Sequence, residues 1–139
     1  MDTGPLVAYL SERERHHPWA VEQFETLDLP FVTCEAVLTE ACFVTARNRQ
    51  PPERVLETVA RGVVQIGLRL DEELPAVRAL MRRYENVPMS LADACLLRLA
   101  EMTGLPICTL DRDFAIYRAN RRRELTLIMP SDPRSLHEP

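Results

Sequence analysis

The stretch PICTLD, residues 106–111, decides how the rest of the sequence is interpreted. Its apolar residues follow a proline and end at Asp111, which predicts a short buried strand with a carboxylate directly after it. A helix is predicted before this stretch, over residues 90–102, and Gly104 is suited to end it in a left-handed conformation. A strand preceded by a helix in this way is typical of an α/β fold with a mostly parallel sheet.

The same alternation runs through the rest of the chain. Proline suits the first turn of a helix, so Pro5 and Pro18 mark the starts of the first two predicted helices. The other predicted elements are helices over residues 19–27, 35–47, 71–84 and 114–122, a helix from Pro51 to about Gly62, and strands over residues 31–33, 63–68 and 125–129.

The amino end departs from this pattern. A parallel α/β domain usually begins with a strand that leads into its first helix, yet only Met1 precedes Asp2. We therefore expect the first strand to be missing or truncated. We also expect the positive α-amino group of Met1 to lie one residue from Asp2 and to compete with any cation for its carboxylate.

Length and composition fit one soluble domain. The chain has 139 residues, a net charge of −4 and 46% hydrophobic residues, enough for a single core. We expect one domain over residues 1–130 and a loose, proline-rich tail over residues 131–139. The sequence shows neither a signal peptide nor a long apolar run, so we expect a cytoplasmic protein without membrane contact.

Lysine is absent, since all 17 basic residues are arginine. This excludes a P-loop, a Schiff-base enzyme and the phosphotransferases that place a lysine beside their strand-end aspartates, such as receiver domains. The four glycines form no GxGxxG loop. His16, His17 and His137 lack metal-ligand spacing, and the cysteines form no CxxC pair, so we expect free, buried thiols at Cys34, Cys42, Cys95 and Cys108.

Two aspartates are predicted at the carboxyl ends of strands, where open α/β sheets bind their ligands. Asp111 follows the strand at residues 106–110, and Asp2 stands where a first strand would end. Glu40 and Asp93 have apolar residues three and four positions away on their predicted helices, so we expect both carboxylates to point inward. Gathered carboxylates repel one another, so such a pocket would either hold protons or bind a hard cation such as Mg²⁺ or Mn²⁺. With a bound cation this set of residues permits phosphodiester hydrolysis.

Each carboxylate also has a purely structural interpretation. Asp2 can cap the first helix, and Asp93 completes a capping-box pattern that starts at Ser90. Asp111 can begin an ordinary turn, and Glu40 can reach solvent or pair with the arginine seven residues on. Only their combined placement at strand ends and inward faces favours a site.

Four motifs resemble the PIN domain: DTGPLVA at residues 2–8, VLTE at 37–40, MSLADA at 89–94 and TLDRDF at 109–114. The resemblance covers Asp2 to about Met129 and implies an α/β/α sandwich around a parallel sheet. By motif position it implies a metal-binding quartet of Asp2, Glu40, Asp93 and Asp111, a more distant fifth acid at Asp113, and hydrogen bonds from Thr109 and Ser90. Glu35 is the rival of Glu40 but lies outside the motif.

Many small, single-domain PIN proteins are VapC-type toxins, which are metal-dependent endoribonucleases restrained by a small antitoxin. The resemblance therefore implies Mg²⁺ or Mn²⁺ as cofactor, RNA as substrate, an antitoxin partner and a homodimer. PIN domains normally carry an apolar strand before the first aspartate, and its absence here keeps a second hypothesis open, a PIN-fold binding module without catalysis. A phosphatase or DNA nuclease using the same acids is a third.

The arginines at residues 118–123 have two interpretations. They form a candidate track for RNA phosphates, or a solvated helix face with favourable charges near the helix C-terminus.

Overall fold

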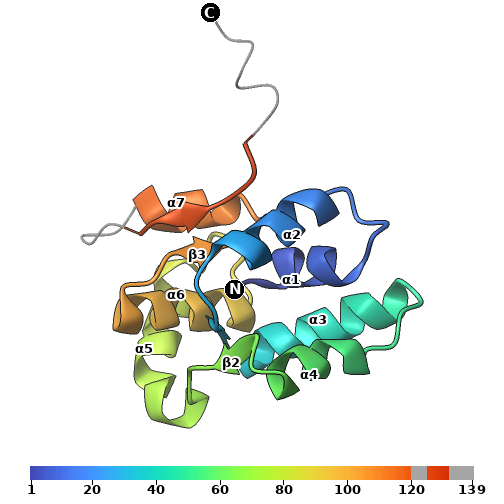
Figure 1. Ribbon diagram of the computed structural model, residues 1–139. Coiled ribbons are helices and arrows are strands. Elements are labelled where there is room, and N and C mark those ends of the chain that lie inside the picture. The colour runs from blue at the N-terminus through green and yellow to red at the C-terminus, as the bar shows by residue number, and fades with distance from the viewer. Residues whose placement is uncertain (120–124, 132–139) are drawn as a thin grey trace, which may run out of the picture.

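The computed structural model describes residues 1–119 and 125–131 of the chain (Figure 1). In chain order the elements are α1 (Thr3–Leu10), α2 (His17–Thr26), β1 (Phe31–Thr33), α3 (Glu35–Arg47), α4 (Glu53–Ala60), β2 (Val64–Ile66), α5 (Leu70–Arg83), α6 (Leu91–Thr103), β3 (Ile107–Cys108), α7 (Asp113–Ala119) and β4 (Leu127–Ile128). The predicted α/β fold with parallel strands is confirmed. The side chains of residues 118–123 and most of the predicted tail, residues 132–139, lie outside the described part.

The strands form two parallel pairs. β1 pairs with β2, with Phe31 opposite Val64, and β3 pairs with β4, with Ile107 opposite Leu127. The strands are shorter than the apolar runs that predicted them. Among the described residues each pair has a strand on one side only, so the ladder extends over two or three residues.

Met1 and Asp2 lie between the two pairs (Figure 1). The amino group of Met1 donates a hydrogen bond to the carbonyl of Val32 in β1, at 2.9 Å. The peptide N–H of Asp2 donates to the carbonyl of Cys108 in β3, also at 2.9 Å. These two residues therefore connect β1 to β3 through main-chain hydrogen bonds.

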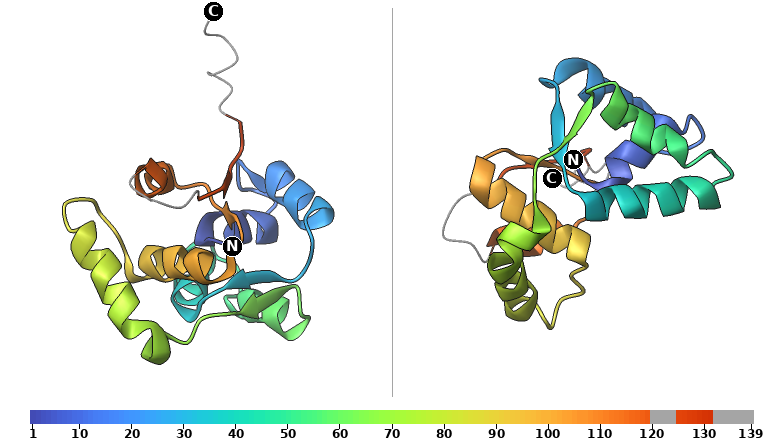
Figure 2. Two further views of the ribbon diagram at one scale, coloured as in Figure 1. Left: turned by 90° about the vertical axis from the view of Figure 1, so that its left-hand side faces the viewer. Right: turned by 90° about the horizontal axis from the view of Figure 1, so that it is seen from below.

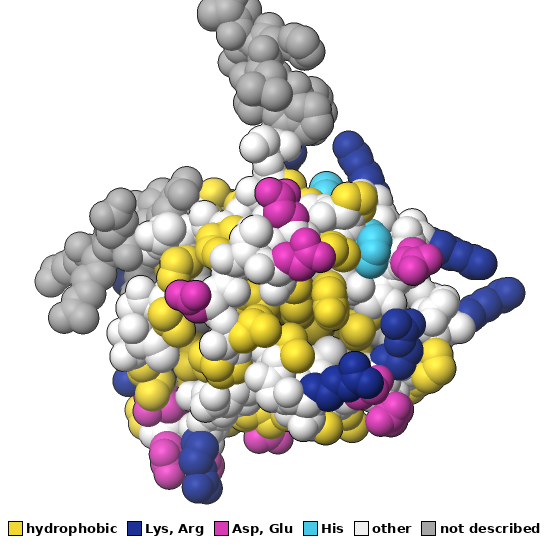
Figure 3. Space-filling model, in the orientation of Figure 1, with side chains coloured by type: hydrophobic (Ala, Val, Ile, Leu, Met, Phe, Trp, Pro, Cys, Tyr) yellow, Lys and Arg dark blue, Asp and Glu magenta, His cyan; other side chains and the backbone are white. Residues whose placement is uncertain are grey.

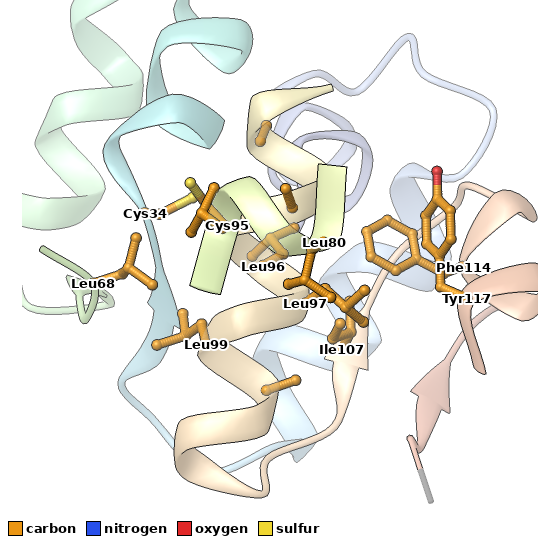
Figure 4. Close-up of a cluster of buried hydrophobic side chains, with 14 of the residues drawn as sticks. Cys34, Leu68, Leu80, Cys95, Leu96, Leu97, Leu99, Ile107, Phe114 and Tyr117 are labelled. Carbon is orange, nitrogen blue, oxygen red and sulfur yellow. The ribbon is translucent and has the colours of Figure 1, made fainter. Parts of the chain in front are cut away.

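The helices gather around this junction in two groups. The right view of Figure 2 shows α5 and α6 on one side of the N-terminus and α1 to α4 on the other. The core of the first group is drawn in Figure 4, where side chains of α6 and α7 such as Leu96, Leu97, Phe114 and Tyr117 meet. The second core is built around Leu6, Phe24, Val55 and Val64. Burial of these apolar side chains supplies the main driving force for the fold.

Two local features position the aspartates that the sequence analysis singled out. The helix α6 is capped at its N-terminus by Ser90, which forms the predicted capping box with Asp93, and at its C-terminus by Gly104, with φ of 70°. At the start of α1, a Cβ on Gly4 would lie only 3.1 Å from the side chain of Leu110. A glycine there lets α1 approach the end of β3 closely, so that Asp2 comes near Asp111.

All four cysteines are free, as predicted, and Cys34, Cys95 and Cys108 are buried, whereas the expectation of a buried thiol is wrong for Cys42, which is only half-buried. Among the residues that the structure describes, none of the helices is long and apolar enough to cross a membrane.

Candidate functional site

Asp2 is a buried carboxylate held by two hydrogen bonds. Its Oδ1 accepts from the peptide N–H of Thr3 at 2.7 Å, and its Oδ2 accepts from the hydroxyl of Thr109 at 2.6 Å. Only 6% of the residue is exposed. Burial raises the pKa of Asp2, against the lowering effect of these hydrogen bonds and of the Met1 amino group, while the charge of Asp111 raises it further. Asp2 thus caps α1, as its structural interpretation predicted, and also faces a second acid.

Thr109 connects Asp2 to the loop after β3. It is fully buried, and its Oγ1 accepts from the peptide N–H of Asp111 at 2.9 Å while its proton goes to Asp2. Asp111 Oδ1 then accepts from the peptide N–H of Asp113, also at 2.9 Å. One threonine therefore fixes the relative position of two aspartates that are more than a hundred residues apart in sequence. The expected hydrogen bond from Thr109 to a site carboxylate is present.

Asp93 contributes a third carboxylate from the first turn of α6. Its Oδ2 accepts from the peptide N–H of Ser90, and the Ser90 hydroxyl accepts from the peptide N–H of Asp93, both at 3.1 Å. Burial raises the pKa of Asp93 to about 6, with further raising from the negative charges of Asp2 and Asp111 against the lowering effect of the Ser90 bond. The structural interpretation of Asp93 as a cap is correct, and the carboxylate also lies within electrostatic reach of the other two.

The expectation that Glu40 points inward is wrong. Glu40 is exposed, because the buried face of α3 is formed by Val37, Leu38, Ala41 and Thr45 and leaves position 40 outside it. Its Oε2 accepts from the hydroxyl of Thr3 at 3.1 Å, which keeps it beside the residue that follows Asp2. Glu35 is also exposed. Arg47, which the sequence offered as a partner of Glu40, instead places its guanidinium over the ring of exposed Phe43, at 5.9 Å from the ring centroid.

Two residues on α7 complete the surroundings of the acids. Asp113 is half-buried at the start of the helix. Tyr117, one turn later, is fully buried, and its hydroxyl donates to the carbonyl of Pro88 at 3.1 Å. Burial raises the pKa of Tyr117 to about 12, and the charges of Asp93, Asp113 and Asp111 add to this effect. Sequence reasoning missed Tyr117, because an aromatic residue on an apolar helix has only its spacing from Asp113 to distinguish it.

The amino group of Met1 is the positive charge nearest to Asp2 in sequence, as expected. It is buried, and burial lowers its pKa against the raising effect of nearby groups including Asp2. The reciprocal effect lowers the pKa of Asp2. The charged form of the amino group favours ionisation of Asp2, while burial, the largest effect on the amino group, disfavours that charged form.

The donor set suits a hard cation in its chemistry, since it consists of carboxylate oxygens, and the charge of Asp111 raises the pKa values of Asp2 and Asp93. The side chains do not form a closed cage. Within residues 1–119 and 125–131, no three His, Cys, Asp or Glu side chains come close enough to hold one ion. The exposed position of Glu40 is one reason, because its carboxylate is directed at Thr3 and solvent rather than at Asp93 or Asp111.

A model of the PIN domain family matches residues 1–120, so this chain belongs to the PIN domain family. No curated protein matches the sequence. PIN domains are generally metal-dependent nucleases that act on RNA or DNA, and they usually bind a divalent metal such as Mg²⁺.

Proposed function

We propose that this protein is a metal-dependent endoribonuclease whose metal ligands are Asp2, Glu40, Asp93 and Asp111. Asp113 is the fifth acid of the site, more distant from the cation. The observation that carries the proposal is that Thr109 hydrogen-bonds both Asp2 and the peptide of Asp111, and that the charges of these two aspartates raise the pKa of Asp93, which comes from a third part of the sequence. Carboxylates with raised pKa values favour either protons or a divalent cation, and Mg²⁺ or Mn²⁺ prefers such oxygen ligands.

The chain's own residues orient these acids. Thr109 directs Asp2 and the peptide of Asp111, while Ser90 directs Asp93. Thr3 holds Glu40 near Asp2. When bound, Mg²⁺ or Mn²⁺ supplies activation of water and stabilisation of the departing oxygen of a phosphodiester. Neither task needs a lysine, which agrees with a chain whose basic residues are all arginine.

The biological role that we propose is that of a VapC-type toxin, restrained by a small antitoxin and assembled as a homodimer. The support is the PIN domain match, which covers residues 1–120 of 139. Arg121, Arg122 and Arg123 as a track for RNA phosphates stay a prediction, since they lie outside the described residues.

The test is cleavage of single-stranded and structured RNA with Mn²⁺ or Mg²⁺. We expect Asp93→Asn and Asp111→Asn to reduce cleavage at least 100-fold without lowering the thermal midpoint. Asp71→Asn is the matched control, because Asp71 is an exposed acid on α5 away from the site. Cleavage that survives both site substitutions would overturn the proposal.

A second candidate function, an RNA- or protein-binding module without catalysis, is favoured by one observation. Glu40 is exposed, and the described acids form no ready group of three. This candidate predicts RNA or partner binding with no cleavage at any Mg²⁺ or Mn²⁺ concentration. A shift in thermal midpoint on addition of Mn²⁺, lost in Asp111→Asn, favours the nuclease.

A further inference from the structure

The exposed face of α3 carries one large apolar side chain, that of Phe43. This residue is 67% exposed, whereas Thr39 and Ala46 on the same face are small. A single exposed apolar residue is ordinary, so the neighbours of Phe43 decide what it can do. Glu40 lies three residues before it and Arg47 four residues after it. By helical spacing the ring therefore shares one strip of surface with a proposed metal ligand and with an arginine.

Arg47 lies against this ring. Its guanidinium carbon is 5.9 Å from the ring centroid of Phe43, which is a cation–π arrangement. Phe43 is still 67% exposed with the guanidinium in this place, so the ring has surface left for a further planar group. An exposed aromatic ring beside an arginine is the combination on which single-stranded nucleic acids stack their bases.

The end of α3 belongs to a positively charged edge of the molecule. The amide of Asn48 donates to the carboxylate of Glu14 at 3.2 Å, which holds the loop after α1 against the end of α3. The residues on either side of these two are exposed arginines: Arg13, Arg15, Arg47 and Arg49. Figure 3 shows arginine side chains at the right-hand edge, where Figure 1 places this loop and the end of α3.

This arginine edge is available to an anion. In residues 12–15 and 47–49 four arginines stand against two glutamates, Glu12 and Glu14. Within residues 1–119 and 125–131, none of the four arginines forms an ion pair. The phosphates of a nucleic acid backbone are the partners that such unpaired arginines suit, since the guanidinium can hold a phosphate through two parallel hydrogen bonds.

Two hydrogen bonds fix the arginine edge relative to the acids. Thr3 donates to Glu40 at the start of α1, and Asn48 donates to Glu14 beyond its end, so α1 and α3 run side by side in the same direction. From Glu40 to Arg47 the helix rises by about 10 Å. Stacked nucleotides rise by about 3.4 Å each, so this span corresponds to roughly three of them. A strand that starts at the acids therefore reaches the arginine edge within a few nucleotides.

We propose that the exposed face of α3 binds single-stranded RNA beside the acids, with a base stacked on Phe43 and the adjoining phosphates contacted by Arg47 and Arg49. This inference rests on the proposed function, because it takes RNA as the substrate. It makes the substrate single-stranded, since only an unpaired base can lie flat on the ring. A protein partner fits this face less well, because interface cores are depleted of charge, whereas Phe43 stands between Glu40 and Arg47.

The first experiment measures the affinity for a fluorescein-labelled single-stranded RNA by anisotropy, in a chelator, so that binding is observed apart from metal-dependent cleavage. Phe43→Leu keeps an apolar side chain but removes the ring, and we expect the affinity to fall at least about 5-fold. Phe43→Trp should retain or raise the affinity, because a larger ring supports the same stacking. Leu74→Ala is the control, since Leu74 is 45% exposed on α5, and it should leave the affinity unchanged.

The second experiment tests the phosphate contacts through their dependence on salt. Arg47→Gln and Arg49→Gln should each reduce the slope of log affinity against log salt concentration by about 0.7, the release expected for one phosphate of a single strand. Arg78→Gln, at an exposed position on α5, should leave the slope unchanged. Phe43→Trp adds a direct readout, because RNA should quench its fluorescence beyond any quenching of Trp19, the single tryptophan of the original chain.

Four results would overturn the inference: no RNA binding by the original chain, equal affinities of the original chain and Phe43→Leu, equal losses in Phe43→Leu and Phe43→Trp, or equal binding of a fully double-stranded RNA. Unchanged RNA binding in Phe43→Leu together with loss of a dimer in analytical ultracentrifugation would assign the face to a second copy. If cleavage of RNA is present and depends on Asp93 and Asp111, such results leave the proposed nuclease standing. Cleavage that survives both aspartate substitutions would instead overturn the proposed function, while the binding measured in chelator still decides the role of Phe43.

Discussion

Asp2 and Glu40 lie on neighbouring elements and are linked through Thr3, yet their carboxylates are held very differently. Asp2 is 6% exposed and accepts hydrogen bonds on both oxygens. Glu40 is exposed and accepts a single side-chain hydrogen bond, from Thr3. The buried side of the site is therefore ordered by folding itself, whereas the exposed side can be ordered only by what binds there. Substitutions should affect stability on the first side and activity alone on the second.

The largest expected effect on stability comes from Thr109→Val. This change keeps the side-chain volume but removes the hydroxyl that donates to Asp2 and accepts from the peptide of Asp111. A buried carboxylate then loses a donor, so we expect the free energy of unfolding to fall by about 1–3 kcal/mol in urea denaturation.

Thr45→Val is the matched control. Thr45 is equally inaccessible, at 3% exposed, but within the described residues its hydroxyl has no hydrogen-bond partner. Removing that hydroxyl should leave stability unchanged or slightly raised. Equal losses in the two variants would show that the loss in Thr109→Val comes from side-chain packing and not from the bonds to Asp2 and Asp111.

The second-largest effect on stability is expected from Asp93→Asn, which should raise the free energy of unfolding by an amount that depends on pH. The pKa of Asp93 is raised from 3.8 to about 6 on folding, so the folded state keeps this proton longer than the unfolded state. Stability therefore falls as pH rises through this window, and the penalty is fully present above it. Asp93→Asn should be more stable than the original chain at pH 8, on the order of 1 kcal/mol after allowance for solvent screening, and equal to it below pH 4.

The measurement is urea denaturation at pH 4, 6 and 8 in the presence of a chelator. Asparagine retains an oxygen that can accept from the Ser90 peptide, so the capping box is preserved. A difference between the two proteins that stays constant with pH would show that the ionisation of Asp93 is not the cause.

The smallest effect on stability is expected from Glu40→Gln, on the exposed side. Because the side chain is exposed, the free energy of unfolding should change by less than about 0.5 kcal/mol. RNA cleavage should nevertheless fall at least 10-fold if Glu40 is a metal ligand. Glu35→Gln, at an exposed position on the same helix, should alter neither property. Equal activity in the two variants would remove Glu40 from the site.

The sequence predicted most of the elements because their signals are local. The helix over residues 35–47 has the predicted bounds, and the caps at Ser90 and Gly104 are where the sequence places them. The inward position of Glu40 was not predictable in the same way. Helical spacing gives the apolar side of α3 only approximately, and its partners α1 and α6 decide which border position becomes buried. The strands are shorter than predicted for a similar reason, because the length of a strand depends on its pairing with a neighbouring strand, which periodicity in the sequence does not reveal.

The sequence by itself determined the α/β alternation and the restriction to carboxylate chemistry, because composition, spacing and the order of elements are properties of the chain alone. Only the tertiary structure decided that Thr109 joins Asp2 to Asp111 and that Tyr117 lies near the acids. These facts depend on contacts between segments far apart in the chain. Burial, hydrogen bonding and charge interaction at such contacts arise only when the two halves of the fold pack together.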